Sequence, residues 1–164
     1  MREFDLQALL ASLEEHGVRF VVIGGVAVGA HGFLRTTEDL DLIPDPAPEN
    51  LKRLIAALAA MGATLPTAAG RPFSPRRDGV VILEGGNVTA DTKFGGLDVI
   101  QRLRGVPPYS ELIEDAVESD LLGAPVRVCS LSRLREMKRA LSRPRDQIDL
   151  ENLPEARNRS SDAQ

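Results

Sequence analysis

Runs of apolar residues divide the chain into helices and strands that alternate along its length. Apolar residues at helical spacing, with proline, serine and glycine near the ends, predict helices over residues 4–15, 25–31, 48–61, 109–116, 131–141 and 144–153. Short apolar and β-branched runs predict strands over residues 19–23, 40–43, 80–83, 87–92, 97–100, 117–121 and 126–129. This order of elements predicts an α/β fold.

Glycine-rich and irregular stretches predict the connections. Gly85–Gly86 and Gly95–Gly96 separate β-rich runs and predict tight hairpins. Residues 63–78 carry glycine, proline and arginine without a regular pattern and are interpreted as a mobile surface loop. Because no repeat divides the chain, we expect one domain over residues 1–153, followed by a disordered polar tail over residues 154–164.

Size and composition fit a domain with one core. The chain has 164 residues, of which 43% are hydrophobic and 27% are charged, as in ordinary globular proteins. The longest apolar run, residues 20–30, is too short to span a bilayer and is interrupted by glycines, and no apolar core of a signal peptide is present. The single cysteine, Cys129, excludes an internal disulfide and a cysteine-clustered zinc site. We therefore expect a cytoplasmic protein that does not enter a membrane.

Charge is distributed unevenly along the chain. The net charge of −4 gives no reason to expect general attraction to nucleic acid. Residues 127–145 nevertheless hold one acid, Glu136, against Arg127, Arg133, Arg135, Lys138, Arg139, Arg143 and Arg145. Such a basic segment suits a triphosphate or an RNA backbone. A solvated helix face is the equally supported alternative.

Two carboxylates and a glycine pair lie close together in residues 21–45. Asp39 and Asp41 flank Leu40 at the start of a strand, so the alternation of side chains points both acids to one face. Neighbouring carboxylates repel each other unless a cation lies between them, and ligand sets made only of oxygen favour Mg²⁺ or Mn²⁺. The Gly24–Gly25 turn leads into a predicted helix and offers unblocked backbone amides to a phosphate. This combination suggests phosphoryl or nucleotidyl transfer.

A two-metal site for displacement at phosphorus needs a third carboxylate. Asp98 is the best candidate because it lies in the apolar run 97–100, where an unpaired acid would be costly to bury. Asp91 is the competing candidate, but its polar neighbours indicate an ordinary polar face. An ion pair with a nearby arginine, such as Arg102, is the structural alternative for Asp98.

These residues carry a family resemblance. The pattern GG-x-A-x-x-x-HG-x-x-R-x-T-x-D-x-D, from Gly24 to Asp41, together with Asp98, resembles the nucleotidyltransferase superfamily with a polymerase-β-like catalytic core. It is most similar to the bacterial branch that includes abortive-infection and toxin–antitoxin nucleotidyltransferases. The later runs FGGLDVI, GVPPYSEL and LSRLREMKRALSRPRDQIDLENL also resemble that branch. The resemblance covers residues 21–153 and implies a small mixed sheet with flanking helices.

The resemblance also implies roles for single residues. Asp39 and Asp41 would bind the metal that carries the nucleotide phosphates. Asp98 would complete a second metal site and help to deprotonate the attacking hydroxyl. Gly24 and Gly25 would let the backbone approach the triphosphate. Many relatives carry serine at the second of these two positions, so Gly25 removes one side-chain contact to phosphate.

Three other residues belong to the expected nucleotide site. Arg35 and Thr37 precede the acids, where a guanidinium could neutralise phosphate or orient a carboxylate, and a structural ion pair is the alternative for Arg35. Lys138 projects from the predicted helix 131–141, and the resemblance implies that it contacts the triphosphate.

Four nearby polar residues are interpreted as structural. His31, next to a glycine, is expected to end a helix and not to act as a base. Asp146 and Asp149 lie one turn apart in the last predicted helix and are expected to pair with neighbouring arginines, with a role in the site, implied by their match to the family ending, as the alternative. Cys129 is expected to be a small buried hydrophobic side chain.

The resemblance implies transfer of a nucleoside monophosphate from an NTP to a hydroxyl, with release of pyrophosphate. An RNA end, a protein side chain and a small molecule all remain open as acceptors, and a cognate toxin or antitoxin is the expected partner. The alternative is a catalytically silent antitoxin or regulatory binding partner that keeps the fold without turnover.

Overall fold

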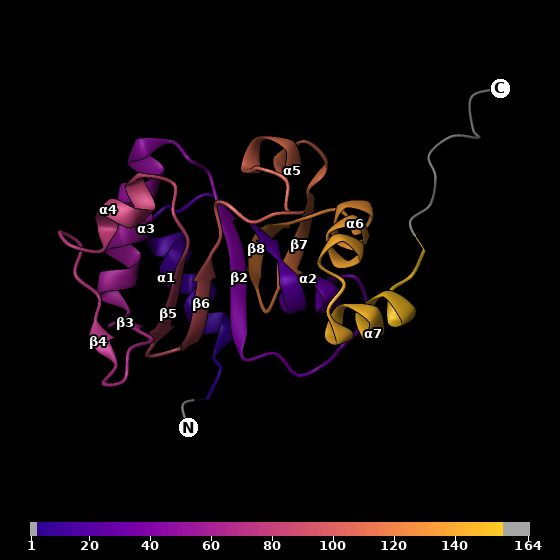
Figure 1. Ribbon diagram of the computed structural model, residues 1–164, viewed down its shortest axis with the longest axis horizontal. Coiled ribbons are helices and arrows are strands. Elements are labelled where there is room, and N and C mark those ends of the chain that lie inside the picture. The colour runs from indigo at the N-terminus through magenta and orange to yellow at the C-terminus, as the bar shows by residue number, and fades with distance from the viewer. Residues whose placement is uncertain (1–2, 156–164) are drawn as a thin grey trace.

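The computed structural model describes residues 3–155 and confirms the α/β fold (Figure 1). The helices are α1 Leu6–Glu15, α2 Gly24–Ala30, α3 Pro48–Ala60, α4 Gly79–Leu83, α5 Tyr109–Asp115, α6 Leu131–Leu141 and α7 Pro144–Asn152. The strands are β1 Phe20–Ile23, β2 Asp39–Pro44, β3 Thr64–Leu65, β4 Arg71–Pro72, β5 Val88–Thr92, β6 Gly95–Val99, β7 Val117–Leu121 and β8 Ala124–Val128. All but two residues of the expected tail lie outside the described residues.

The strands form one mixed sheet of eight in the order β4-β3-β5-β6-β2-β1-β8-β7. At its centre β2 runs antiparallel to β1 and parallel to β6. Side chains alternate along β2: Leu40 and Leu42 are fully buried, whereas Asp39 and Asp41 are on the other face and partly accessible. One face of β2 therefore packs in the hydrophobic core, and its other face carries the two acids.

Helices gather at both ends of this sheet. Figure 1 shows α3 and α4 beside the β3–β5 end and α6 and α7 toward β7 and β8, while α1 contacts both α3 and β8 and α2 packs on β1 and β2. Buried leucines of α1 and α3 form much of the core, which includes Leu9, Leu13, Leu54 and Leu58. Within residues 3–155, no helix combines the length and the apolar character that a bilayer crossing requires.

Local end signals fix the helices as the sequence predicts. The side chain of Asp5 accepts a hydrogen bond from the Ala8 amide at the start of α1. Ser130 caps α6 in the same way by accepting from the Arg133 amide, and Pro144 occupies the first turn of α7. The expected helices 131–141 and 144–153 are thereby confirmed to within one residue.

The expected strand 80–83 is wrong, because this run forms the helix α4. Four consecutive apolar residues carry no period that separates helix from strand. The Gly85–Gly86 pair ends this helix and does not make a hairpin: Gly85 and Gly86 donate to the carbonyls of Ile82 and Val81, with Gly85 at a positive φ of 80°.

Residues 63–78 are more regular than the expected loop. The short strands β3 and β4 pair there and extend the sheet. The carboxylate of Asp78 accepts hydrogen bonds from Arg71, Arg77 and the Ser74 amide, which together hold its pKa below the ordinary range even though burial opposes them. Neither the pairing of β3 with β4 nor the contacts of Asp78 produce a periodic pattern in the sequence.

The hairpin expected near Gly95–Gly96 does form, but its turn is Lys93–Phe94 and the glycines open β6.

Candidate metal and nucleotide site

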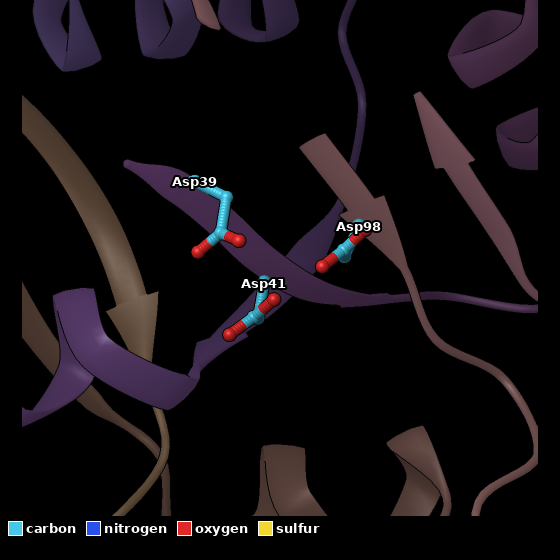
Figure 2. A group of neighbouring side chains, drawn as sticks. All are labelled: Asp39, Asp41 and Asp98. Atoms are coloured by element: carbon cyan, nitrogen blue, oxygen red, sulfur yellow. The ribbon is translucent and has the colours of Figure 1, made fainter. Parts of the chain in front are cut away.

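Three carboxylates converge on the polar face at the centre of the sheet. Asp39 and Asp41 come from β2, and Asp98 comes from β6, where the parallel register places it directly opposite Asp41. One oxygen of each carboxylate lies within 4.8 Å of the others, close enough to share a metal ion. Figure 2 shows the three side chains pointing into a common space. The expected acids are thus brought together, whereas Asp91 is exposed on β5 and is not in this group.

Burial and repulsion between neighbouring carboxylates make Asp39 and Asp41 reluctant to ionise. Burial is the largest cause that raises the pKa of Asp41, to about 7, and the charge of Asp39 and a hydrogen bond to Asp98 add to it. The pKa of Asp39 is also raised, by burial and by the charge of Asp98, while Arg145 opposes the rise. A cation held between the carboxylates would remove this repulsion.

The donor set fits a hard divalent cation. All three candidate ligands are carboxylates, and the group contains no histidine or cysteine. Oxygen-only sets of this kind suit Mg²⁺ or Mn²⁺ and do not suit zinc or copper. Asp39, Asp41 and Asp98 are therefore the residues that would hold such an ion.

The acids form one wall of a cavity of about 340 Å³. It is lined by every residue expected in the site, together with two arginines: Gly24, Gly25, Arg35, Thr37, Asp39, Asp41, Asp98, Lys138, Arg143 and Arg145. The cavity thus unites the ends of β1, β2 and β6 with α6, α7 and the segment before β2.

Glycine is required beside the acids because the backbone comes very close to them. Gly24 has a positive φ of 69°, and a β-carbon there would lie 2.0 Å from a carboxylate oxygen of Asp41. A β-carbon on Gly25 would lie 2.6 Å from the side chain of Thr37 and 3.1 Å from the guanidinium of Arg35. A side chain at Gly25, including serine, would therefore need Thr37 to shift.

A buried ion network holds another part of the cavity wall. Arg35 makes a bidentate pair with Asp149, at 2.7 and 2.9 Å. The Lys138 ammonium lies 2.9 Å from carboxylate oxygens of both Asp146 and Asp149. Asp146, Asp149 and Lys138 are all buried. The expected pairing of the two acids with arginines is confirmed, since Arg143 also binds Asp146.

This network changes the interpretation of two expected nucleotide ligands. Arg35 and Lys138 line the cavity, but both cations are already paired with carboxylates. Burial opposes ionisation of Asp146, yet hydrogen bonds from Arg143 and Lys138 outweigh it and lower its pKa to about 2. Asp149, paired with Arg35 and Lys138, likewise has a lowered pKa despite burial. Arg35 and Lys138 therefore have a structural role: their ion pairs with Asp146 and Asp149 fix the shape of this wall.

Arg143 and Arg145 reach the cavity from the start of α7. Sequence reasoning names them only as members of the basic segment, because nothing in a linear pattern shows which arginines face a pocket. Among the described residues Arg145 has no ion pair, and its charge acts on Asp39. Arg145 is the exposed cation of the site that is free to meet an anion.

Much of the remaining basic segment is occupied elsewhere. Arg127 and Arg133 lie near acids of the surface, and Arg135 donates to carbonyls at the end of α7. His31 ends α2 and is hydrogen-bonded to the carbonyl of Cys129 at 2.8 Å, as expected for a structural histidine. Cys129 is fully buried, which raises the pKa of its thiol to about 12.

No protein-family model and no curated protein sequence matches the chain. Solved structures do show the same fold. TM1012 of Thermotoga maritima, provisionally named a nucleotidyltransferase, is similar over 89% of this chain and 88% of its own, with 14% identity and a TM-score of 0.56. The antibiotic-resistance factor ANT(2″)-Ia is similar over 89% of this chain and 72% of its own, with 19% identity and a TM-score of 0.54. The chain therefore has the fold of nucleotidyltransferases.

Proposed function

We propose that the chain is a metal-dependent nucleotidyltransferase that moves a nucleoside monophosphate from an NTP to a hydroxyl. The observation that carries the proposal is the convergence of Asp39, Asp41 and Asp98 within 4.8 Å on the wall of a cavity. Three neighbouring carboxylates, two of which, Asp39 and Asp41, have a raised pKa, are destabilising for the folded chain alone. Their convergence is accounted for if they hold divalent cations. The shared fold of TM1012 and ANT(2″)-Ia supports this class of reaction.

The metal ions would neutralise the phosphates and polarise the α-phosphoryl group. Asp39 and Asp41 would hold the nucleotide-bound ion, and Asp98 would complete the second ligand set. Asp98 would also accept the proton of the attacking hydroxyl. The hydroxyl oxygen forms a bond to the α-phosphorus, the bond from that phosphorus to the bridging oxygen breaks, and pyrophosphate leaves with the electron pair.

Polar residues and glycines that line the cavity would supply the expected triphosphate contacts. Gly24 and Gly25 keep this wall free of side chains, so the backbone can approach the phosphates. Thr37 lines the same cavity, and Arg145 supplies a guanidinium without an ion pair in the described chain. Arg35 and Lys138 contribute positive charge to the same wall while bound to Asp149.

The acceptor is a hydroxyl of RNA, of a protein or of a small molecule. The antibiotic-resistance role named for ANT(2″)-Ia keeps a small molecule among these acceptors. The resemblance of residues 21–153 to the abortive-infection branch supports a toxin–antitoxin or defence context with a cognate toxin or antitoxin. That context rests on the sequence pattern alone.

The proposal is tested by transfer of label. Purified protein is incubated with each α-labelled NTP, Mg²⁺ or Mn²⁺, and either total RNA, protein extract or aminoglycoside. Transfer to one class of acceptor, lost in Asp39→Ala, is the expected result. Equal labelling by the Asp39→Ala protein would show that the reaction does not use this site, and no labelling by either protein would favour the silent regulatory partner.

A further inference from the structure

A smaller apolar cavity opens beside Asp98. It has a volume of about 130 Å³ and shares the side chains of Asp41 and Asp98 with the catalytic cavity. Most of its other wall is aliphatic and comes from two segments far apart in the sequence, Ile100, Leu103 and Val106 after β6 and Leu134, Met137 and Leu141 of α6, and Lys138 and Arg143 complete the lining. We call this cavity the apolar slot.

Close packing and hydrogen bonds fix the walls of the apolar slot. Gly105 has a positive φ of 85°, and a β-carbon on it would lie 2.9 Å from that of Ala140, so the segment packs directly on α6. The side chain of Asn87 accepts hydrogen bonds from the amides of Gln101 and Arg102 at the base of the segment. The slot is therefore held in place without a ligand.

The polarity of the two cavities suggests which part of a nucleotide enters each. If Asp39, Asp41 and Asp98 bind the metal-bound phosphates, as the proposed function holds, the α-phosphate belongs beside the three acids. The departing pyrophosphate carries high charge and suits the side lined by Thr37 and Arg145. The aliphatic walls beyond Asp98 do not suit it.

We propose that the apolar slot binds the nucleobase of the NTP. This inference rests on the proposed function. The flat faces of a base would be buried against Leu103, Val106 and Met137, which removes apolar surface of both from water. Within residues 3–155, the charged residues that line the slot besides the two acids are Lys138 and Arg143, which are bound to Asp146. A slot that recognises a base by its buried area, and not by hydrogen bonds to its edge, binds a larger base more tightly. Purines should therefore bind with about fivefold higher affinity than pyrimidines.

Leu103 provides the sharpest test because it is 43% exposed, so its replacement leaves the core intact. We compare the affinity of Mg²⁺–ATP and of Mg²⁺–tripolyphosphate, which lacks a nucleoside, for the wild type and for Leu103→Ser. Leu83→Ser is the matched control, since Leu83 is 44% exposed on α4 and does not line the slot. The expected result is about fivefold weaker ATP binding in Leu103→Ser alone, with unchanged tripolyphosphate binding and a reduced ratio of ATP to CTP affinity.

Three outcomes would overturn the assignment. Unchanged ATP affinity in Leu103→Ser, with a raised KM for the acceptor, would assign the slot to the acceptor. Equal affinity of the wild type for ATP and tripolyphosphate would show that the base makes no contact. Failure of both probes to bind the wild type would reject the proposed function itself, a result that differs from the loss of the base contact alone.

Discussion

Asp41 and Asp98 are directly opposite each other on adjacent parallel strands, and their side chains interact through a hydrogen bond and through charge. The pair brings one acid from residue 41 and one from residue 98 to the same point of the sheet. Burial and the charge of Asp39 then raise the pKa of Asp41 to about 7. The relationship has consequences for stability as well as for metal binding.

Asp41→Asn is expected to stabilise the metal-free protein above pH 7. Because the folded-state pKa of Asp41 is raised from 3.8 to about 7, the folded chain binds more protons than the unfolded chain between these values, and its stability falls as pH rises. Removing the carboxylate should increase the free energy of unfolding by about 2 kcal/mol at pH 8, and by much less at pH 4. Urea denaturation at both pH values, with EDTA present, measures the difference. A variant that is less stable than the wild type at pH 8 would contradict the raised pKa.

Binding of Mg²⁺ is expected to strengthen as pH rises through 7. At lower pH a proton on Asp41 competes with the metal, whereas above its pKa of about 7 the carboxylate is free to bind. The rise in Tm on adding 10 mM Mg²⁺, roughly a saturating concentration for a weak oxygen site, should therefore be larger at pH 8 than at pH 6. Asp91→Asn, which changes an exposed acid on β5, should show the same rise as the wild type. An equal rise in Asp39→Ala would place the metal elsewhere.

Gly24→Ala is expected to disrupt the metal site. The new β-carbon would overlap the carboxylate of Asp41 and would also sit at a φ of 69°, which is unfavourable for residues other than glycine. Gly62→Ala is the matched control, because Gly62 has a φ of 63° but no atom within 4 Å of the added carbon. Both variants should lose about 1 kcal/mol of stability from the backbone conformation. Only Gly24→Ala should also lose the Mg²⁺-dependent rise in Tm, and retention of that rise would contradict the close approach.

Lys138→Met is expected to unfold easily because it leaves two buried carboxylates short of a cation. Lys138 is 4% exposed and contacts Asp146 and Asp149, so removing its charge should cost about 3 kcal/mol. Arg139→Met removes a positive charge from the next position on α6, where the side chain is exposed, and should cost less than about 0.5 kcal/mol. Thermal unfolding of the two variants side by side measures the difference. Equal stability would show that the buried network does not support the fold.

The sequence predicts the central strands and the metal-binding acids because both have local signals. Alternation around Leu40 places Asp39 and Asp41 on one face, and the apolar run around Asp98 marks an acid that needs a partner. The helix ends at Ser130 and Pro144 follow from side-chain and backbone chemistry within a few residues. The residues that cause each of these features are its close neighbours in the sequence.

Features that depend on distant contacts were not predictable in the same way. The apolar run 80–83 forms a helix only because of what packs around it, and the strands β3 and β4 are too short to show a period. Lys138 is interpreted from the sequence as a ligand on an exposed helix face, yet it is buried between Asp146 and Asp149. Arg145 is identified as a cation of the cavity without an ion pair in the described part of the chain only once the start of α7 is placed beside β2.

The most direct test of the site compares two acids on adjacent strands. Asp98→Asn removes a proposed metal ligand on β6, and Asp91→Asn removes an exposed carboxylate on β5. The rate of pyrophosphate release from NTP, measured with Mg²⁺ and an acceptor-containing lysate, should fall by about three orders of magnitude in Asp98→Asn. It should stay at the wild-type rate in Asp91→Asn. A wild-type rate in Asp98→Asn would contradict the assignment of the three aspartates as the catalytic metal site.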